Sequence, residues 1–281
     1  MVLLIPAYNE EGRIAPVLQE YGQYFRAHFP ADSFQIVVVL NGCRDQTLAV
    51  VERAMHEFPE IRALNFAAPI GKGGALIEGL KLAQDADWIG YVDADGATPP
   101  AAFHELLKRG AAVDCVIASR WVPGAVLHQS QTGRRQFASR IFHLLVQGLF
   151  WMNIADTQCG AKVMRCDAVR KIHSSLRIAD MAFDINLLFS LKRAGYSILE
   201  VPTEWTDKIG SKVALGKTSL VMLLSVLRLR FVYSPFYRWL RVFRPLEAWV
   251  YRKLHAPPPL TSAQVKTEAA RLHGDEPQAQ R

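Results

Sequence analysis

Short apolar runs alternate with longer stretches of helical periodicity through the first half of the chain. The short runs are apolar at nearly every position, which is typical of strands buried on both faces. They are Val2–Ile5, Gln35–Leu40, Ile61–Asn65, Trp88–Val92 and Asp114–Ala118. The stretches between them, with apolar residues three and four positions apart, are Ile14–His28, Thr47–Phe58 and Gly74–Gln84. This alternation predicts an α/β fold with a mainly parallel central sheet and helices on both faces.

The second half of the chain contains fewer strand-like runs and longer helical patterns. We expect helices at Arg134–Met152, Asp167–His173 and Phe183–Arg193, and strands at Ala161–Met164 and Tyr196–Val201. The chain has 281 residues, of which 50% are hydrophobic, and this is enough for one large core. The same composition excludes intrinsic disorder for most of the protein.

The first residues and the cysteines indicate a reduced, cytoplasmic protein. The run Val2–Ile5 is too short for the apolar part of a signal peptide and no basic residues precede it, so we assign it to the first strand. The four cysteines lie far apart and include no CxxC pair, which favours neither a zinc site nor a dense disulfide framework. They are Cys43, Cys115, Cys159 and Cys166.

Basic charge is concentrated near the C-terminus. The whole chain carries a net charge of +7, whereas residues 212–254 alone carry +8. Within this segment an apolar run at 220–227 precedes eight aromatic residues that are interleaved with arginines. The run is shorter than the ~20 residues that span a bilayer. Such a composition is typical of an interfacial membrane helix, and the alternative is a packed helical hairpin with a basic outer face.

No nucleic-acid-binding motif accompanies the basic segment, so we do not expect a nucleic acid partner. The proline-rich, polar tail at 256–281 is expected to be disordered.

Two aspartates one residue apart, Asp93 and Asp95, directly follow the candidate strand Trp88–Val92. In an open α/β sheet, ligands bind beyond the carboxyl ends of the strands. Two carboxylates there repel each other unless a cation lies between them and an anion, and such oxygen ligands suit Mg²⁺ or Mn²⁺. The alternative is a solvated turn with two surface acids.

Polar or small residues also follow the first three candidate strands. Residues 5–11 read Ile-Pro-Ala-Tyr-Asn-Glu-Glu, residues 40–45 read Leu-Asn-Gly-Cys-Arg-Asp, and residues 71–74 read Gly-Lys-Gly-Gly. We expect all these strand ends to converge at one edge of the sheet. The glycines would let an anion approach a helix N-terminus, and Lys72 would neutralise phosphate. The spacing matches neither a Walker A loop nor GxGxxG, and the alternative is a tight turn.

The ordered series of motifs resembles the family-two inverting glycosyltransferases of the GT-A fold. The residues that carry the resemblance are 5–11, 41–47, 71–75 and 93–98. Later motifs are similar to those of dolichyl-phosphate β-glucosyltransferases and related polyprenyl-phosphate sugar synthases, namely 118–120, 156–162, 182–184 and 204–212. The resemblance implies a GT-A catalytic domain at 1–212 and amphipathic membrane-interface helices at 213–255, followed by the disordered tail.

The resemblance also implies roles for individual residues. The residues that match the sugar-nucleotide site are Pro6, Ala7, Tyr8, Glu10, Asn41, Asp45, Lys72, Asp93 and Lys212. Asn41 stands where the family usually has aspartate, which weakens its match. Asp93 and Asp95 match the metal motif, with Asp95 as the more direct ligand of Mg²⁺ or Mn²⁺. Arg120, together with Arg134 or Arg135, matches positions that bind the acceptor phosphate, and Asp184 matches an acidic position near the acceptor.

The reaction implied is transfer of a hexose from a sugar nucleotide, UDP-glucose being favoured over GDP-mannose, to a polyprenyl phosphate. The cation, with Lys72 or Lys212, would stabilise the leaving diphosphate. Arg120 would position the acceptor phosphate by bidentate hydrogen bonds. Asp184 would act in acceptor-side electrostatics, or as a general base if the acceptor is a hydroxyl. Its structural alternative is an N-cap of the helix Ile185–Arg193.

We expect a peripheral enzyme on the cytosolic membrane face, with residues 219–253 on an anionic lipid surface. One alternative is a soluble glycosyltransferase acting on a hydroxyl of a glycan or small molecule, which the lack of the N-terminal membrane helix of eukaryotic glucosyltransferases favours. Another is a non-catalytic protein that binds a sugar nucleotide or a membrane. We expect His143, His173 and Cys159 to be structural.

Overall fold

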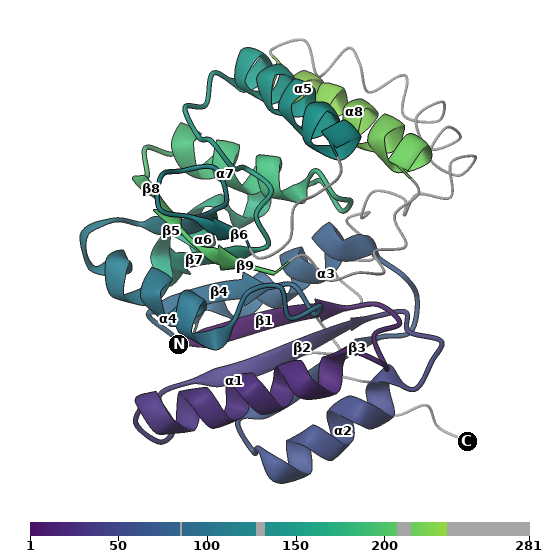
Figure 1. Cartoon of the computed structure of the whole chain (residues 1–281), viewed down its shortest axis with the longest axis vertical. Coiled ribbons are helices and arrows are strands. Elements are labelled where there is room, and N and C mark those ends of the chain that lie inside the picture. The colour runs from purple at the N-terminus through teal and green to yellow at the C-terminus, as the bar shows by residue number, and fades with distance from the viewer. Residues whose placement is uncertain (85, 128–132, 207–214, 235–281) are drawn as a thin grey trace, which may run out of the picture.

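A seven-stranded sheet forms the centre of the chain in a computed structural model that describes residues 1–84, 86–127, 133–206 and 215–234 (Figure 1). The strand order is β3-β2-β1-β4-β7-β5-β8. The strands are β1 Val2–Ala7, β2 Gln35–Asn41, β3 Ile61–Phe66, β4 Trp88–Val92, β5 Cys115–Ser119, β7 Ala161–Arg165 and β8 Ile198–Pro202. Six of them run in one direction, and β7 is antiparallel to its neighbours β4 and β5. The predicted mainly parallel sheet is confirmed.

Helices cover both faces of this sheet, as predicted. They are α1 Ile14–His28, α2 Thr47–Glu57, α3 Gly71–Gly79, α4 Pro100–Arg109, α5 Gly133–Phe150, α6 Cys166–Ile172, α7 Phe183–Arg193 and α8 Leu215–Val232. The 3₁₀ turns are η1 Leu80–Gln84, η2 Gly110–Ala112 and η3 His173–Ser175. Helices α1, α2 and α4 pack on one face, and α3, α6 and α7 pack on the other (Figure 1).

Strand β1 shows why an uninterrupted apolar run becomes a central strand. Successive side chains of a strand point to opposite faces of the sheet. Leu3 and Ile5 accordingly join the core under α1, while Val2 and Leu4 join the core under α3, and all four are at most 6% exposed. Burying each such side chain contributes about 1.5–3 kcal/mol, so a strand that is apolar on both faces is most stable between two helical layers.

Strand β7 has a direction that no local pattern predicts. It lies between β4 and β5, and its register pairs Lys162 with Tyr91 on one side and with Ile117 on the other. Because β7 runs against its neighbours, its first residues and the preceding loop lie where β4 and β5 end. The loop at 156–160 therefore reaches the edge of the sheet that carries the aspartate pair.

Local boundaries differ from the predictions at several elements. The third helix begins at Gly71 rather than Gly74, and its last turn is the 3₁₀ segment η1. A second sheet pairs the short strands β6 Val126–Leu127 and β9 Glu204–Trp205, which are too short to produce a periodic signal.

The C-terminal helix α8 lies beside α5 at the end of the molecule away from α1 and α2 (Figure 1). It contains the apolar run predicted at 220–227, and its residues Val226 and Leu229 are fully buried in the core cluster with α6 and α7. In the described part of the chain, every helix is too short or too polar to cross a bilayer. The remainder of the predicted interface segment at 235–255, the tail at 256–281 and the domain boundary at 212 fall outside the described residues.

Candidate active site

The loops that follow β1 and β2 are joined to each other by side-chain hydrogen bonds. Asn9 Oδ1 accepts the backbone N–H of Arg44 at 2.8 Å, and Thr47 Oγ1 accepts that of Glu10 at 2.8 Å. Asn9 adopts a φ of 55°, a left-handed conformation that asparagine tolerates well. The two strand ends predicted to converge therefore form one connected surface.

Asp45 and Asn41, both matched to the sugar-nucleotide site, also hold these loops in place. Asp45 accepts hydrogen bonds from the N–H and hydroxyl of Thr47 and from the N–H of Glu11. Burial alone would raise the pKa of Asp45, but these hydrogen bonds lower it. Asn41 is buried and its Oδ1 accepts the N–H of Ile70 at 2.7 Å, which ties the end of β2 to the segment before α3.

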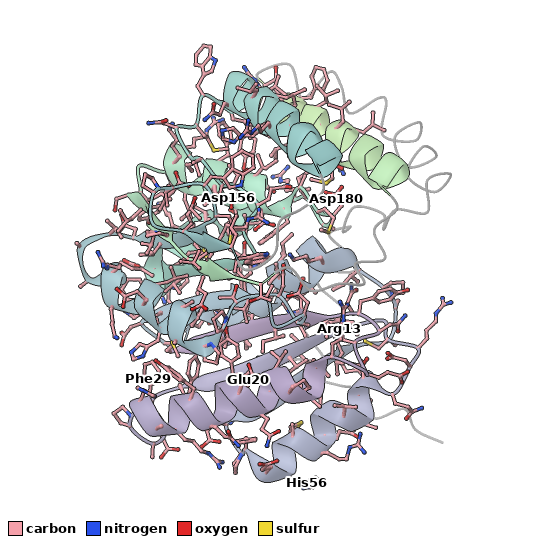
Figure 2. All side chains as sticks on the ribbon, viewed as in Figure 1. Arg13, Glu20, Phe29, His56, Asp156 and Asp180 are labelled. Carbon is pink, nitrogen blue, oxygen red and sulfur yellow. The ribbon has the colours of Figure 1, made fainter. Side chains whose placement is uncertain are left out.

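The end of β1 presents a mixed surface beside these loops. Pro6 and Ala7 are the last residues of the strand, and the side chain of Tyr8 is half exposed. Glu10 forms a bidentate ion pair with Arg13, with Nε–Oε2 and Nη2–Oε1 distances of 2.7 and 2.8 Å. Figure 2 shows Arg13 on this side of the molecule, next to the start of α1.

Asp93 and Asp95 lie at the carboxyl end of β4, as predicted, and Lys72 lies next to them. Lys72 Nζ is 2.5 Å from Asp93 Oδ1, so the helix α3 and the strand β4 are joined by an ion pair. Asp95 Oδ1 accepts the N–H of Ala97 at 3.0 Å. Burial and the nearby charge of Asp93 raise the pKa of Asp95, although Lys72 and Arg13 partly oppose the effect.

Asp95 is thus a partly buried carboxylate next to a second carboxylate, a place where a bound cation would be favourable. No group of three or more His, Cys, Asp or Glu side chains gathers into a metal site among the described residues. Mg²⁺, however, usually binds through one or two carboxylates and takes further ligands from substrate phosphates. Asp93 and Asp95 fit that kind of site, in which the ligand set is completed by the substrate.

Gly160 makes room for the carboxylate of Asp93. A Cβ atom at position 160 would overlap Asp93 Oδ2, because the loop before β7 passes directly over the aspartate. The neighbouring Cys159 is fully buried, consistent with close packing here. The role of this loop is therefore to pack against the aspartate pair without displacing it.

Gly160→Ala is expected to lower kcat for catalysis at this site about 10- to 100-fold, since small displacements of catalytic groups have effects of this size. The measurement is steady-state kinetics with the sugar-nucleotide donor that the sequence predicts. Gly148→Ala is the matched control, because in the described part of the chain no atom beyond its own helix backbone lies within 4 Å of a Cβ placed there. Equal activity of the two variants would contradict the proposed crowding at Asp93.

Gly73 and Gly74 pack closely against neighbouring segments. A Cβ on Gly73 would lie 2.6 Å from Ile178 O and 2.6 Å from Phe183 Cβ. The N–H of Gly74 donates to Ala179 O at 3.0 Å. Gly71 has a φ of 80°, which only glycine adopts readily. The glycines thus press α3 against the segment that leads into α7 and fix Lys72 at its position.

Arg120 follows β5 and is held by Asp156. Its Nε and Nη2 donate to the two carboxylate oxygens of Asp156 at 2.7 and 2.9 Å, and its guanidinium lies 5.1 Å from the ring centre of Trp205. Glu200 in turn accepts the backbone N–H groups of Ala155 and Asp156. Figure 2 places Asp156 on the side of the sheet below α5.

Asp184 lies in the first turn of α7, where it pairs with a buried lysine. Lys162 Nζ is 2.5 Å from Asp184 Oδ1, and the hydroxyl of Tyr91 donates to the same oxygen. The structural alternative of an N-cap is wrong, because the capping position is Ala182 and no side-chain cap bond is formed. Burial alone would raise the pKa of Asp184, but Lys162, Lys72 and the Tyr91 hydroxyl hold it below its usual range, so Asp184 is poorly suited to take up a proton.

Three residues matched to the substrates are not described at their side chains. Arg134 and Arg135 belong to the first turn of α5, and only the backbone of that turn is described. Lys212 lies outside the described residues. The two histidines expected to be structural make ordinary contacts: His173 Nε2 is 2.8 Å from Ile77 O, and His143 lies near Trp121.

Sequence reasoning assigned no role to Lys162, Asp156 or Arg13. Lys162 and Asp156 lie inside a motif that was singled out, but their partners are 22 and 36 residues away. An apolar strand interrupted by one lysine, Ala161–Met164, is the signal that could have marked Lys162, since a buried ammonium needs a partner.

Comparison with known proteins gives consistent matches. The model of the family described as Glycosyl transferase family 2 matches residues 2–173. A dolichyl-phosphate beta-glucosyltransferase of Dictyostelium discoideum is 30% identical over 247 residues, which cover 82% of this chain and 74% of that protein. The human dolichyl-phosphate beta-glucosyltransferase is 30% identical over 229 residues, which cover 75% of this chain and 68% of that protein. The glycosyltransferase AglD of Haloferax volcanii is 29% identical over 228 residues, but these are 80% of this chain and only 36% of that longer protein.

Solved structures share the fold. Glucosyl-3-phosphoglycerate synthase from Mycobacterium tuberculosis, in complex with Mn²⁺, UDP and glucosyl-3-phosphoglycerate, superimposes with a TM-score of 0.61 at 18% identity. The match covers 83% of this chain and 81% of that one. Another structure of the same synthase contains Mg²⁺ and UDP, with a TM-score of 0.60 at 16% identity.

Proposed function

The chain belongs to glycosyl transferase family 2 and is a glycosyltransferase of the GT-A fold, and we propose that it transfers glucose from UDP-glucose to a polyprenyl phosphate. The assignment of a sugar-nucleotide donor is carried by the aspartate pair at the end of β4, where Lys72 Nζ lies 2.5 Å from Asp93 Oδ1. The assignment of a polyprenyl-phosphate acceptor is supported by relatives that are named dolichyl-phosphate beta-glucosyltransferases. Arg120, near the same sheet edge, supports it as well.

The donor reaction separates charge, and the site is suited to stabilise it. Breaking the bond between the sugar C1 and the diphosphate oxygen leaves the bonding electrons on the diphosphate. Mg²⁺ or Mn²⁺ held by Asp93 and Asp95 would neutralise part of this charge when bound. The ammonium of Lys72 would supply a further positive charge at the same place. The solved complexes of the synthase with Mn²⁺ or Mg²⁺ and UDP support a divalent metal in this fold.

The acceptor oxygen would form its bond to C1 from the face opposite the diphosphate, with inversion. A lipid phosphate is already anionic, so this step needs positioning more than a general base. Arg120 would orient the phosphate through the N–H groups that Asp156 leaves unused, together with Arg134 or Arg135. A hydroxyl acceptor would need a base, and Asp184 is a poor one because Lys162 and Tyr91 both bind its Oδ1.

The remaining donor-side residues would hold the nucleoside. Tyr8 is half exposed beside the loops at the ends of β1 and β2, and it is available to contact a base. Glu10 and Asp45 would act through these loops, because their carboxylates already pair with Arg13 and with Thr47. Asn41 would act mainly by holding Ile70. Lys212 is proposed to reach the diphosphate from the segment before α8.

The proposed site of action is the cytosolic face of a membrane, where a polyprenyl phosphate resides. The basic and aromatic composition of residues 219–253 supports contact with anionic lipid, since each basic residue near such a surface contributes about 1 kcal/mol. Leu144 of α5, Trp151 directly after α5 and Phe231 of α8 are exposed apolar side chains on or next to the two helices that lie side by side.

The experiment that tests the proposed function is a transfer assay. The purified protein, incubated with labelled UDP-glucose, Mg²⁺ or Mn²⁺ and a short polyprenyl phosphate in vesicles, should yield a labelled lipid-linked glucose. GDP-mannose and a polyprenol without phosphate are the controls for donor and acceptor. Vesicles that contain phosphatidylglycerol should also retain the protein at low salt and release it at high salt. Absence of any lipid-linked sugar with either donor would contradict the proposal.

A further inference from the structure

Lys162 is a charged residue in the middle of a buried strand. Its side chain is 0% exposed, and its register places it between Tyr91 of β4 and Ile117 of β5. Nζ donates to Cys159 O at 2.7 Å and lies 2.5 Å from Asp184 Oδ1. Removing an ammonium from water costs several kcal/mol even when it is paired, and an apolar pair often stabilises a core as well as a buried ion pair does. The presence of a charged pair, Lys162 and Asp184, at this place therefore calls for a reason other than stability.

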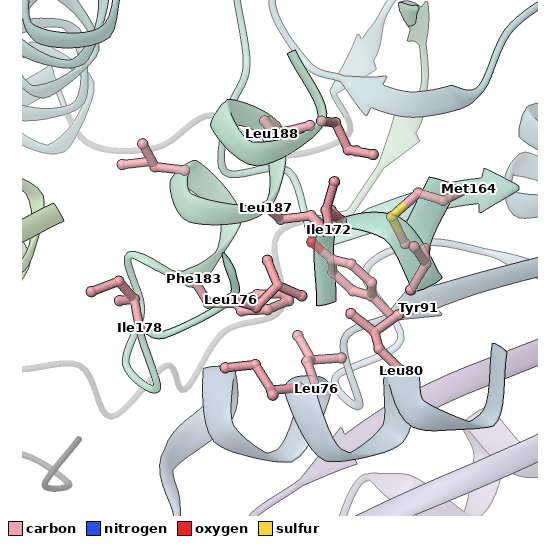
Figure 3. Close-up of a cluster of buried hydrophobic side chains, with 14 of the residues drawn as sticks. Leu76, Leu80, Tyr91, Met164, Ile172, Leu176, Ile178, Phe183, Leu187 and Leu188 are labelled. Carbon is pink, nitrogen blue, oxygen red and sulfur yellow. The ribbon is translucent and has the colours of Figure 1, made fainter. Parts of the chain in front are cut away.

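The partner of Lys162 is a fixed anion. Asp184 is 4% exposed, and Lys162 and the Tyr91 hydroxyl both donate to its Oδ1. Burial alone would raise the pKa of Asp184, but the positive charges of Lys162 and Lys72 hold it below the usual range. Figure 3 shows Tyr91 reaching from β4 towards α7, between Leu80 of η1 and Leu187 of α7. The surrounding apolar packing leaves the carboxylate little freedom to move.

Asp184 is coupled to the donor side through Lys72. The ammonium of Lys72 lies 2.5 Å from Asp93 Oδ1. The two helices that carry Lys72 and Asp184 are in direct contact, since a Cβ on Gly73 would lie 2.6 Å from Phe183 Cβ. Lys72 and Asp184 are thus the chain neighbours of two residues in close contact, Gly73 and Phe183, and the side chain of Lys72 is 22% exposed.

We propose that Lys162 is a positioning residue for glycosyl transfer: it holds Asp184 as a fixed anion, and Asp184 in turn holds Lys72 where the leaving diphosphate gains its charge. The proposal rests on the proposed function for the identity of the leaving group. Lys162 itself touches no substrate, because its side chain is fully buried. Its effect on the reaction is therefore expected to pass through Asp184.

A double-mutant cycle tests this path. Lys162→Met keeps the length of the side chain without its charge, and Asp184→Asn keeps the shape of the carboxylate without its charge. Each is expected to lower kcat about 10- to 100-fold, the usual range for groups that orient a catalytic shell, with KM for the acceptor unchanged. The double variant should be no less active than the less active of the two single variants. The reason is that either single substitution already removes the ion pair through which Lys162 and Asp184 act. Losses that multiply would overturn the proposal.

A matched control separates positioning from simple stability. Lys81 also pairs with a fully buried carboxylate, that of Glu78, but away from the aspartate pair. Lys81→Met should lower the unfolding temperature about as much as Lys162→Met does and leave kcat of the folded protein unchanged. An equal loss of kcat in both variants would mean that Lys162 acts only through stability, and would overturn the proposal.

Binding of UDP tests the role of Lys162 independently of the acceptor. Calorimetric titration of the same four proteins of the cycle with UDP and Mg²⁺ needs no acceptor. The two single variants should bind UDP more weakly, and the double variant should bind it no more weakly than the weaker single one. Failure of wild-type lipid transfer with this binding pattern intact would count against the proposed function alone. Unchanged UDP affinity in Lys162→Met would overturn the inference alone.

Discussion

Asp95→Asn is expected to lower kcat for sugar transfer about 100- to 1,000-fold at saturating donor, the usual effect of removing one preorganised electrostatic group. The carboxylate of Asp95 lies beside that of Asp93, and burial and this neighbour raise its pKa. The negative charge of Asp95 is unfavourable in the free protein, but it would stabilise a cation bound together with a diphosphate. Asparagine can still accept the N–H of Ala97, so the turn should keep its shape.

Asp95→Asn is not expected to destabilise the fold. Removing one of two adjacent negative charges relieves repulsion, so the unfolding temperature should stay the same or rise. Kinetics over a range of Mg²⁺ and Mn²⁺ concentrations, together with thermal unfolding, measure both effects. Glu105→Gln is the control, because the side chain of Glu105 on α4 is 43% exposed and pairs with the surface cations Lys108 and Arg109. Wild-type turnover in Asp95→Asn at every metal concentration would refute the assigned metal role.

Arg120→Ala is expected to lower the free energy of unfolding by about 3 kcal/mol, because it leaves the carboxylate of Asp156 without its cation. Asp156 is 4% exposed, and Arg120 binds both of its oxygens. The variant should also lose transfer to the acceptor phosphate. Arg26→Ala is the matched control: the pair of Arg26 with Glu60 lies at the surface, where such pairs contribute at most about 1 kcal/mol.

The stability lost in Arg120→Ala should depend on pH. Burial would raise the pKa of Asp156, but the hydrogen bonds and charge of Arg120 lower it below the ordinary aspartate value. A lowered pKa in the folded state contributes stability above the pKa of the unfolded state, about 3.9, and this is lost as the pH falls through the folded value. Without Arg120, burial raises the folded-state pKa of Asp156. The difference between wild type and variant should therefore be full at neutral pH and shrink in acid, as the pH falls through the raised pKa of the variant and then through the lowered pKa of the wild type. Denaturant unfolding at several pH values measures it, and a difference that grows in acid would contradict the role of this pair.

Much of the fold could be predicted because its signals are local. The runs Val2–Ile5 and Gln35–Leu40 are apolar on both faces, and only a strand between two helical layers buries both. The same locality places Asp93 and Asp95 at the end of β4, since they follow its last apolar residue. Parallel neighbours then bring the ends of β1 and β2 to the same edge without any knowledge of side-chain contacts.

Other features of the site depend on contacts between distant residues. Asp184 matched an acidic position near the acceptor, but its partners Lys162 and Tyr91 come from two different strands. Gly73 lies in a stretch that reads as a tight turn, and Gly160 lies in a family-like motif. The structure shows instead that a Cβ at position 73 would clash with Phe183 and one at position 160 with Asp93. A pattern of residue types along the chain records neither the partner nor the distance.

The sequence by itself determined the alternation of strands and helices, the location of the aspartate pair and the family. These features follow from side-chain periodicity and from motifs whose residues are close in the chain. Only the tertiary structure decided that β7 runs antiparallel between β4 and β5, and therefore that Lys162 meets Asp184 and that Gly160 lies over Asp93. The physical reason is that strand direction and buried ion pairs are set by the packing of the whole core, in which segments far apart in sequence must fit together at once.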